Sequence, residues 1–309
     1  MPPEPGLPAV AVRDLVVRYG TRTAVAGLSF TAAAGQVTAL VGPNGAGKTS
    51  TVEACVGLRR PTSGAVTVLG EQLRASGPTP GLRARVGVML QDGGLYATAR
   101  PLELLRHIAS LYPRALDPTT LLDRLGVDPS TRTTIRRMSG GEQRRVAAAA
   151  ALVGGPELAF LDEPTSGLDA IARRGFHDLI RELVAGGTTV ILTTHIMDDV
   201  ERLADHVVIV AGGRALRDGA VRDLVGDDES ITFRGPLHAD LTGLQAVLPP
   251  GGHVAESSPG TYRVTGAADP LVLSAIASWC AQHDISTAGL SVGRRSLEDV
   301  VVELVGGME

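Results

Sequence analysis

The chain has 309 residues, enough for one large domain and a smaller one, and 44% of them are hydrophobic, enough for a buried core. The formal net charge of −4 argues against a nucleic-acid binder, because neutralising phosphates requires a basic surface. Residues 228–309 hold ten acidic and four basic side chains, so the acidic surplus lies in the last part of the chain.

The two cysteines, Cys55 and Cys280, lie far apart and outside any metal-ligand spacing, which favours a reducing cytosolic setting with both thiols buried. No apolar run reaches the length of about 18 residues that a membrane span needs. The proline-rich start lacks the charged and apolar regions of a signal peptide. We therefore expect another protein to hold the chain at any membrane where it works.

Strands and helices are predicted to alternate in the first part of the chain. Apolar patterns predict strands over residues 10–17, 37–41, 66–69, 158–161 and 189–193. Three of these are short, continuous apolar runs, which are typical of buried parallel strands. Helices are predicted over residues 50–58 and 101–112, and a turn over 61–64. This alternation indicates an α/β sheet.

A change in character near residues 226–229 predicts a boundary between a first domain, residues 1–227, and an accessory domain, residues 228–309. The accessory domain is predicted to contain strand 231–233, helix 241–248, strands 253–257 and 262–265, helix 271–282, strand 285–291 and helix 297–304. The first six elements follow the split βαβ order of an α+β, ferredoxin-like fold. Because the domain has no phosphate-binding motif, we expect it to hold no catalytic group.

Residues 42–49, Gly-Pro-Asn-Gly-Ala-Gly-Lys-Thr, fit the pattern GxxxxGK[ST], with a strand before it and a helix after it. Successive backbone N–H groups in such a loop form a nest for anions, and the helix adds positive charge at its N-terminus. We expect Lys48 to reach the β- and γ-phosphates of a nucleotide and the Thr49 hydroxyl to ligate Mg²⁺. Nucleotide contacts are predicted at Gly42, Pro43, Asn44, Gly45, Ala46, Gly47, Lys48, Thr49 and Ser50.

Two carboxylates, Asp162 and Glu163, come directly after the apolar run 158–161. Burying such a pair without a role is costly. In an enzyme with a phosphate loop, Asp162 would hold Mg²⁺ through water, and Glu163 would polarise the attacking water as a catalytic base.

A second phosphate-binding element is predicted at residues 138–146, Met-Ser-Gly-Gly-Glu-Gln-Arg-Arg-Val, before an alanine-rich helix. Ser139 is a good N-cap, and Gly140 and Gly141 leave bare N–H groups at the helix N-terminus. The segment resembles the LSGGQ signature of ABC ATPases, with Met138 in place of the usual Leu and Glu142 in place of the usual Gln.

This resemblance extends over roughly residues 10–225 and implies a P-loop ABC ATPase domain, with a mixed sheet core and a helical subdomain at about residues 92–150. It implies ATP and Mg²⁺ as cofactors. Tyr19 would stack on adenine, Gln91 would be the Q-loop glutamine that contacts the metal and assists catalysis, Asp169 would lie in the D-loop, and His195 would be the catalytic switch histidine at the γ-phosphate. It also implies a homodimer in which Ser139, Gly140 and Gly141 of one copy contact the nucleotide of the other.

The kind of ABC ATPase is indicated by the end of the chain. Residues 295–306 resemble the Ser-Leu-Glu-Asp-Val-Phe tail of daunorubicin-type drug-export ATPases, and residues 91–96 also fit that group. The resemblance implies the ATPase subunit of an exporter of drug, antibiotic or lipid-like cargo, bound peripherally to a separate permease at the cytoplasmic face of the membrane. The tail also fits an ordinary amphipathic closing helix, and residues 101–112 fit a core helix as well as a dock for the permease.

An importer ATPase and a soluble, non-transport ABC ATPase are the alternatives. Only 91 positions separate Lys48 from Ser139, with no sustained heptads, which argues against the long coiled coil of chromosome-type members. Translation-type members usually carry two cassettes, and one is visible here. The acidic tail also disfavours nucleic acid as a partner. A neighbouring permease gene would indicate export, and a periplasmic-type binding protein would indicate import.

Overall fold

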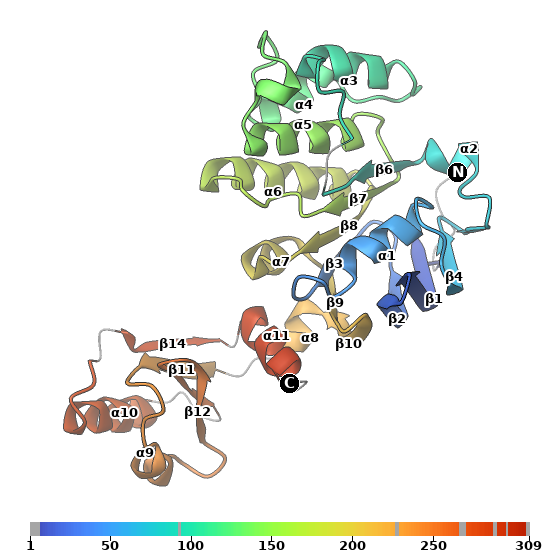
Figure 1. Cartoon of the computed structure of the whole chain (residues 1–309). Helices are drawn as coiled ribbons and strands as arrows, with labels where there is room; N and C mark the ends of the chain where they lie inside the picture. Colours follow the sequence, from blue (N-terminus) through green and yellow to red (C-terminus); the bar gives the residue numbers. More distant parts are fainter. Residues whose placement is uncertain are drawn as a thin grey trace. The chain divides into compact units, whose positions relative to one another are not determined.

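The computed structural model describes residues 7–91, 94–225, 229–265, 270–286, 289–294 and 296–306. The chain divides into two compact units, Met1–Val221 and Arg222–Glu309 (Figure 1). The sequence predicts a boundary between residues 227 and 228, a few residues later, and that position stays a prediction.

The centre of the first unit is a six-stranded sheet in the order β10-β9-β3-β8-β7-β6. Its strands are β3 (Val37–Val41), β6 (Val86–Met89), β7 (Leu158–Asp162), β8 (Thr189–Thr194), β9 (His206–Ala211) and β10 (Arg214–Ala220). All neighbours are parallel except β9 and β10. Every residue of β3, β7 and β8 is buried, as expected for parallel strands covered on both faces.

A second, antiparallel sheet in the order β2-β1-β4-β5 completes the core of this unit. Its strands are β1 (Val10–Tyr19), β2 (Arg22–Ala32), β4 (Ser63–Val68) and β5 (Glu71–Gln72). Helix α1 (Lys48–Cys55) contacts both sheets. Aliphatic side chains of the two sheets and α1 share one hydrophobic cluster, which includes Leu15, Leu28, Val52 and Phe160.

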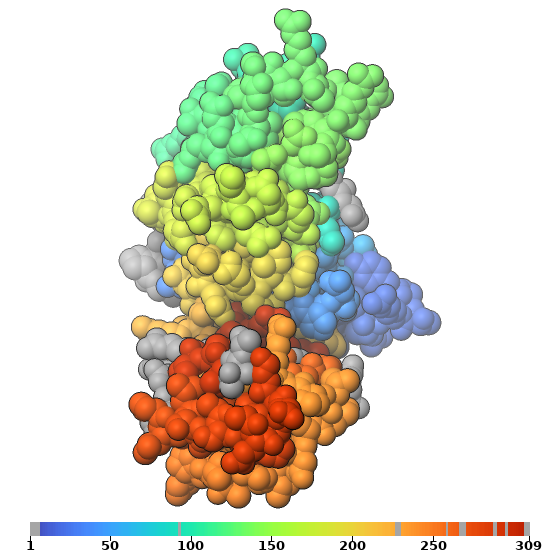
Figure 2. All heavy atoms as spheres, turned by 90° about the vertical axis from the view of Figure 1, so that its left-hand side faces the viewer, coloured from blue at the N-terminus to red at the C-terminus, as the bar shows by residue number. Residues whose placement is uncertain are grey.

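Helices cover the sheet edge next to β6 and the side near β7 and β8 (Figures 1 and 2). They are α2 (Pro80–Arg83), α3 (Pro101–Ala109), α4 (Pro118–Arg124), a 3₁₀ turn (Ile135–Arg137), α5 (Gly140–Leu152), α6 (Ala170–Ala185) and α7 (Met197–Leu203). Helices α3, α4 and α5 contact one another. Figure 2 shows this part, in green, as one end of the unit. The predicted helical subdomain at about residues 92–150 covers these helices apart from the end of α5.

Helix α8 (Val221–Val225) spans the boundary between the units. The second unit contains β11 (Glu229–Arg234), α9 (Thr242–Val247), β12 (His253–Ser258), β13 (Thr261–Thr265), α10 (Pro270–Gln282), β14 (Ser291–Arg294) and α11 (Leu297–Gly306). Its sheet is antiparallel, in the order β12-β13-β11-β14. This order agrees with the expected ferredoxin-like topology, and the classification of this unit stays a prediction.

One predicted strand of this unit is placed wrongly. The strand expected over residues 285–291 begins only at Ser291. The apolar Ile285 that suggested it is buried in the core, and its N–H donates to the carbonyl of Cys280 at 2.9 Å, so it closes the end of α10. An apolar residue that closes a helix was therefore mistaken for the start of a strand.

Candidate functional site

The loop between β3 and α1 depends on glycines that no larger residue can replace. Gly42 has φ 151°, and a Cβ there would lie 1.9 Å from the carbonyl oxygen of Val210. Gly47, the N-cap of α1, has φ 104°, and its Cβ would lie 2.4 Å from the carbonyl oxygen of Ala24. The left-handed backbone and the close approach of neighbouring strands thus fix the shape of the predicted phosphate loop.

The ammonium of Lys48 is held across this loop. Its Nζ donates to the carbonyl oxygen of Gly42 at 2.7 Å and to that of Pro43 at 3.1 Å. Burial lowers the pKa of Lys48, while the carboxylates of Glu163 and Asp162 act in the opposite direction. A confined cation beside two carboxylates is suited to attract a phosphate or a metal–phosphate complex.

A pocket of about 470 Å³ opens at the loop, within the range of small-molecule sites. It is lined by Tyr19, Arg22, Ala24, Asn44, Gly45, Gly47, Lys48, Thr49, Ser50, Gln91 and Glu163. The structure thereby brings together nine residues that the sequence predicts for the site. Arg22 and Ala24 on β2 were not predicted, because no local pattern connects that strand with the loop.

A second pocket, of about 350 Å³, lies beside α1, β6 and α5. Its lining is mostly aliphatic, with Tyr112 and Arg83 among the exceptions. None of the predicted site residues lines it. The predicted chemistry therefore belongs to the first pocket.

Asp162, the last residue of β7, is fully buried beside the phosphate loop. The hydroxyl of Thr193 donates to its Oδ1, whereas Oδ2 has no hydrogen-bond partner among the described residues. Burial raises the pKa of Asp162, and the nearby side chains of Thr193 and Thr49 act in the opposite direction. An unpaired buried oxygen is costly, so it indicates a missing partner such as a cation.

These oxygens fit Mg²⁺ better than a metal that needs a complete protein cage. The described residues contain no group of three or more His, Cys, Asp or Glu side chains placed to share a metal. Mg²⁺ usually takes only one or two protein oxygens and completes its shell with water and substrate phosphates. The Thr49 hydroxyl and the Asp162 carboxylate supply such a partial set.

Glu163 follows in a left-handed backbone conformation, φ 53°, which is uncommon for a non-glycine residue. Its N–H donates to the carbonyl oxygen of Thr193 at 3.0 Å, so β8 supports the turn. Its carboxylate faces His195, whose Nδ1 lies 2.8 Å from Oε2 and 3.0 Å from Oε1. The buried Glu163 and the half-exposed His195 thus form a contacting pair at the ends of neighbouring strands.

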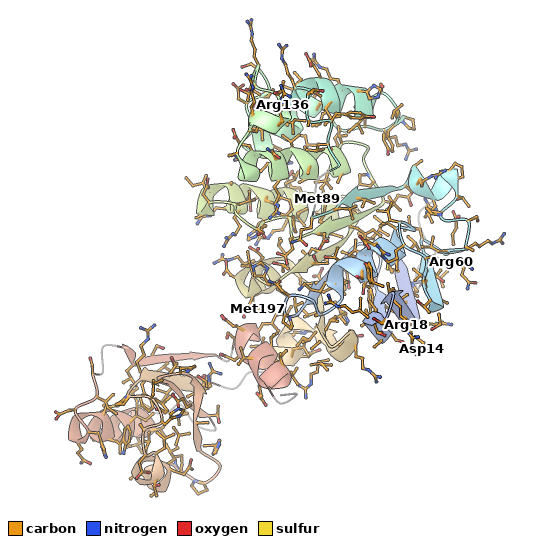
Figure 3. The ribbon with its side chains drawn as sticks, in the orientation of Figure 1. Asp14, Arg18, Arg60, Met89, Arg136 and Met197 are labelled. Carbon is orange, nitrogen blue, oxygen red and sulfur yellow. The ribbon has the colours of Figure 1, made fainter. Side chains whose placement is uncertain are left out.

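Gln91 lies two residues beyond the end of β6, and its side chain is exposed at the pocket wall. Figure 3 labels Met89 at that strand end and Met197 at the start of α7, two residues after His195. Asp92 and Gly93 lie outside the described residues. Gln91 follows β6 and Glu163 follows β7, so the two residues reach the pocket from different strands.

The predicted signature residues do not line this pocket. Ser139 caps α5 in a capping box: its hydroxyl donates to Glu142 Oε2 at 2.7 Å, and the Glu142 N–H donates back at 3.3 Å. Asp169 caps α6 by accepting from the N–H groups of Ile171 at 3.0 Å and Ala172 at 2.8 Å. Within one chain, Ser139 and Asp169 cap helices and do not line the pocket at the phosphate loop.

The sequence analysis missed two residues that support Tyr19. The Tyr19 hydroxyl donates to Glu53 Oε2 at 3.0 Å and lies 3.0 Å from Ser50 Oγ, and both partners are on α1. The guanidinium of Arg59 lies 4.0 Å from the ring centroid, and its Nε lies 2.7 Å from the same Glu53 oxygen. Arg59 does not line the pocket of Tyr19. The regular spacing of Ser50 and Glu53 on one face of α1 was the available signal.

Comparison with known proteins identifies the family. A family model described as ABC transporter matches residues 25–166. The Nod factor export ATP-binding protein I of Ralstonia nicotianae is 33% identical, over 99% of this chain and 97% of its own length. The chain belongs to the ABC transporter ATP-binding proteins. The resemblance that the motifs indicate is thus confirmed, and the chain is an ABC ATPase.

Other relatives of this ABC ATPase are also named for export or drug resistance. The daunorubicin resistance ATP-binding protein DrrA3 of Streptomyces coeruleorubidus is 34% identical over 96% of each chain. A fluoroquinolones export ATP-binding protein of Mycobacterium tuberculosis is 34% identical over 97% of this chain and 94% of its own. A solved ATP binding subunit of an ABC transporter matches with a TM-score of 0.63 and 30% identity, over 70% of this chain and 91% of the other.

These matches confirm the predicted ABC ATPase fold and the similarity to daunorubicin-type proteins. Among the described residues, no helix combines the length and the apolar character needed to cross a bilayer.

Proposed function

We propose that this ABC ATPase binds ATP with Mg²⁺ in the pocket at the phosphate loop and hydrolyses it to drive export across a membrane. The observation that carries the proposal is the contact between Glu163 and His195 beside the Lys48 loop. Two relatives that match nearly the whole chain are named as export ATP-binding proteins, which supports the direction of transport. An importer ATPase and a soluble ABC ATPase find no support in these names.

Different residues of the site would bind the phosphates, the adenine and the metal. The backbone of residues 42–47 and the Lys48 ammonium would bind the phosphates, and Tyr19 would stack on adenine. Thr49 and Asp162, with Gln91 at the rim, would hold Mg²⁺, which neutralises charge on the phosphates when it is bound.

Glu163 would activate a water molecule. It accepts a proton from the water while the water oxygen bonds to the γ-phosphorus. The bond from that phosphorus to the bridging oxygen breaks, and ADP leaves with its electron pair. His195, in contact with Glu163, would contact the γ-phosphate and orient it.

Two copies of the chain would complete the site. Ser139, Gly140 and Gly141 present a helix N-terminus, yet they do not line the pocket of their own chain. In a head-to-tail dimer, this element of one copy would contact the ATP bound to the other, and Asp169 would lie at the same interface. The capping box orders the helix end in advance of that contact.

The proposed partner in transport is a separate integral-membrane permease at the cytoplasmic face of the membrane. Gln91 and α3 would form its dock, because Gln91 lines the pocket and lies in the chain between β6 and α3. Drug, antibiotic or lipid-like molecules are the proposed cargo. Purification of the tagged chain from native membranes, followed by mass spectrometry, should recover one permease; recovery of only soluble proteins would contradict this proposal.

Mixing two inactive variants tests the shared site. Lys48→Ala disables the phosphate loop, and Ser139→Arg disables the signature element. A mixed dimer contains one intact loop facing one intact signature, so mixing should restore up to about a quarter of wild-type turnover in a twofold-symmetric dimer. Wild-type turnover by Ser139→Arg alone would show that each site lies within one chain.

A further inference from the structure

The segments that carry Glu163 and His195 are also joined away from the pocket. Strands β7 and β8 are parallel neighbours, with Asp162 opposite Thr193. Each strand ends, passes through a loop and enters a helix: β7 leads to α6, and β8 leads to α7. The two loops hold Glu163 and His195, so any movement between them changes the distance between the proposed base and its partner.

A buried carboxylate connects these two segments. Asp199 lies on α7, four residues after His195, and is 1% exposed. The hydroxyl of Thr165, two residues after Glu163, donates to its Oδ2. Nε2 of His177 on α6 lies 2.8 Å from its Oδ1, and because a carboxylate can only accept, this ring nitrogen is the donor. Asp199 is thus bound from the loop after β7 and from α6.

The burial of all three partners makes this cluster costly to assemble. Thr165 and His177 are buried as well, at 1% and 4% exposure. Burial raises the pKa of Asp199, but hydrogen bonds from His177 and Thr165 and the charge of Arg173, 3.8 Å away, outweigh it, so the pKa is lowered. A buried carboxylate with two donors and a nearby cation is held in one geometry, because each lost contact leaves an unpaired group.

The neighbouring residue shows what an ordinary carboxylate on the same helix does. Asp198 is 54% exposed and pairs with Arg202, one turn further along α7, at 2.9 Å. Both side chains of that ion pair belong to α7. Asp199 alone of these two adjacent residues links α7 with the loop after Glu163.

We propose that Asp199, Thr165 and His177 form a clasp that sets the position of Glu163 relative to His195, and that Asp199 is a positioning residue for hydrolysis. None of the three lines the ATP pocket, so the clasp acts through the loops and not through ATP. The inference rests on the proposed function. A displacement of about 1 Å between a catalytic group and its partner can reduce turnover about 10²-fold, so a small slackening would be measurable.

Thr165→Val tests the clasp with the smallest change of shape. It removes only the hydroxyl that donates to Asp199. We expect kcat for ATP hydrolysis to fall about tenfold or more, with KM and the affinity for a fluorescent ATP analogue changed less than about threefold. Thr165→Ser, which keeps the hydroxyl, should restore kcat.

Thr188→Val is the matched control for stability. Its hydroxyl donates to the carbonyl oxygen of Pro156 at 3.2 Å, between the opposite ends of the same two strands. We expect this variant to lose thermal stability to a similar degree and to keep kcat within about twofold of wild type, because the link lies far from Glu163. A second matched pair changes adjacent residues of α7. Asp199→Asn should lower kcat as Thr165→Val does, and Asp198→Asn should keep kcat near wild type.

A double variant separates positioning from a general loss of stability. If the clasp acts on the Glu163–His195 contact, Thr165→Val should have little further effect on kcat in a His195→Ala background, because the effects of coupled residues are not additive. A folded Thr165→Val or Asp199→Asn protein with kcat within about twofold of wild type would overturn the clasp. Absence of ATP hydrolysis in the wild type would instead overturn the proposed function.

Discussion

Nδ1 of His195 lies 2.8 Å from Oε2 of Glu163, and this contact joins the loops that follow β8 and β7. Glu163 is almost fully buried, whereas the side chain of His195 is half exposed. Glu163 lines the pocket, and His195 contacts its carboxylate without being among the pocket's lining residues. This arrangement suits Glu163 as a base and His195 as a partner that orients the reacting phosphate. Mutation of each residue by itself can therefore test each role.

Replacement of His195 should affect turnover more than binding. His195→Ala removes the proposed contact to the γ-phosphate and leaves the phosphate loop intact, so we expect kcat to fall about 10²-fold with ATP affinity little changed. His107→Ala, an exposed histidine on α3, is the matched control and should hydrolyse ATP at the wild-type rate. Equal kcat values for the two variants would remove His195 from the mechanism.

The support of Tyr19 by Arg59 predicts an effect on KM. Arg59→Ala removes a cation 4.0 Å from the ring, and at an exposed site this contact is worth about 0.5–1 kcal/mol, or a two- to fivefold rise in KM. Tyr19→Ala removes the proposed stacking surface for adenine and should raise KM further. Arg60→Ala, labelled in Figure 3, is the neighbouring exposed control. If Arg59→Ala and Arg60→Ala have the same KM, Arg59 does not support the base site.

The two thiols should resist alkylation in the folded protein. Burial raises the pKa of Cys55 to about 12 and also raises that of Cys280. A thiol reacts as the thiolate, which forms above its pKa, so iodoacetamide at about pH 8 should modify neither residue until the protein unfolds. Mass spectrometry before and after denaturation measures this. Rapid modification of native Cys55 would show that its surroundings open readily.

The second unit should lose stability when the ion pair between Arg263 and Asp299 is removed. Burial raises the pKa of Asp299, but hydrogen bonds from Ser296 and Arg263 outweigh this and lower it. The carboxylate therefore contributes stability above its unfolded pKa, and the contribution disappears as pH falls through the lower folded value. Asp299→Asn should reduce the free energy of unfolding by about 1–3 kcal/mol at neutral pH and by less in acid.

The stability of the second unit can be measured through Trp279, because this is the one tryptophan of the chain and lies in the core of that unit. Its fluorescence during urea unfolding reports this unit directly. Glu298→Gln changes the exposed neighbour of Asp299 and is the control. A loss of stability that stays constant down to pH 3 would contradict the assigned ionisation.

The sequence alone predicts those parts of the site that short stretches of chain encode. The phosphate loop is one such stretch, since glycine spacing, Lys48 and Thr49 are consecutive, and Asp162 and Glu163 end a visible apolar strand. The support of Tyr19 by Arg59 and of Asp199 by His177 could not be predicted, because each pair comes from separate elements and has no spacing of its own. The misplaced strand at residues 285–291 arose because burial of Ile285 leaves the same apolar signal as a strand.

The central claim is that Glu163 accepts the proton of the attacking water, and steady-state phosphate release measured together with ATP affinity in Glu163→Gln tests it most directly. Glutamine preserves the shape of the side chain but cannot take the proton. Loss of a general base typically costs about 10²–10⁴ in rate, so we expect turnover to fall by that factor while ATP binds at least as tightly. Hydrolysis by Glu163→Gln within about threefold of wild type would contradict the account, since a base contributes far more than that.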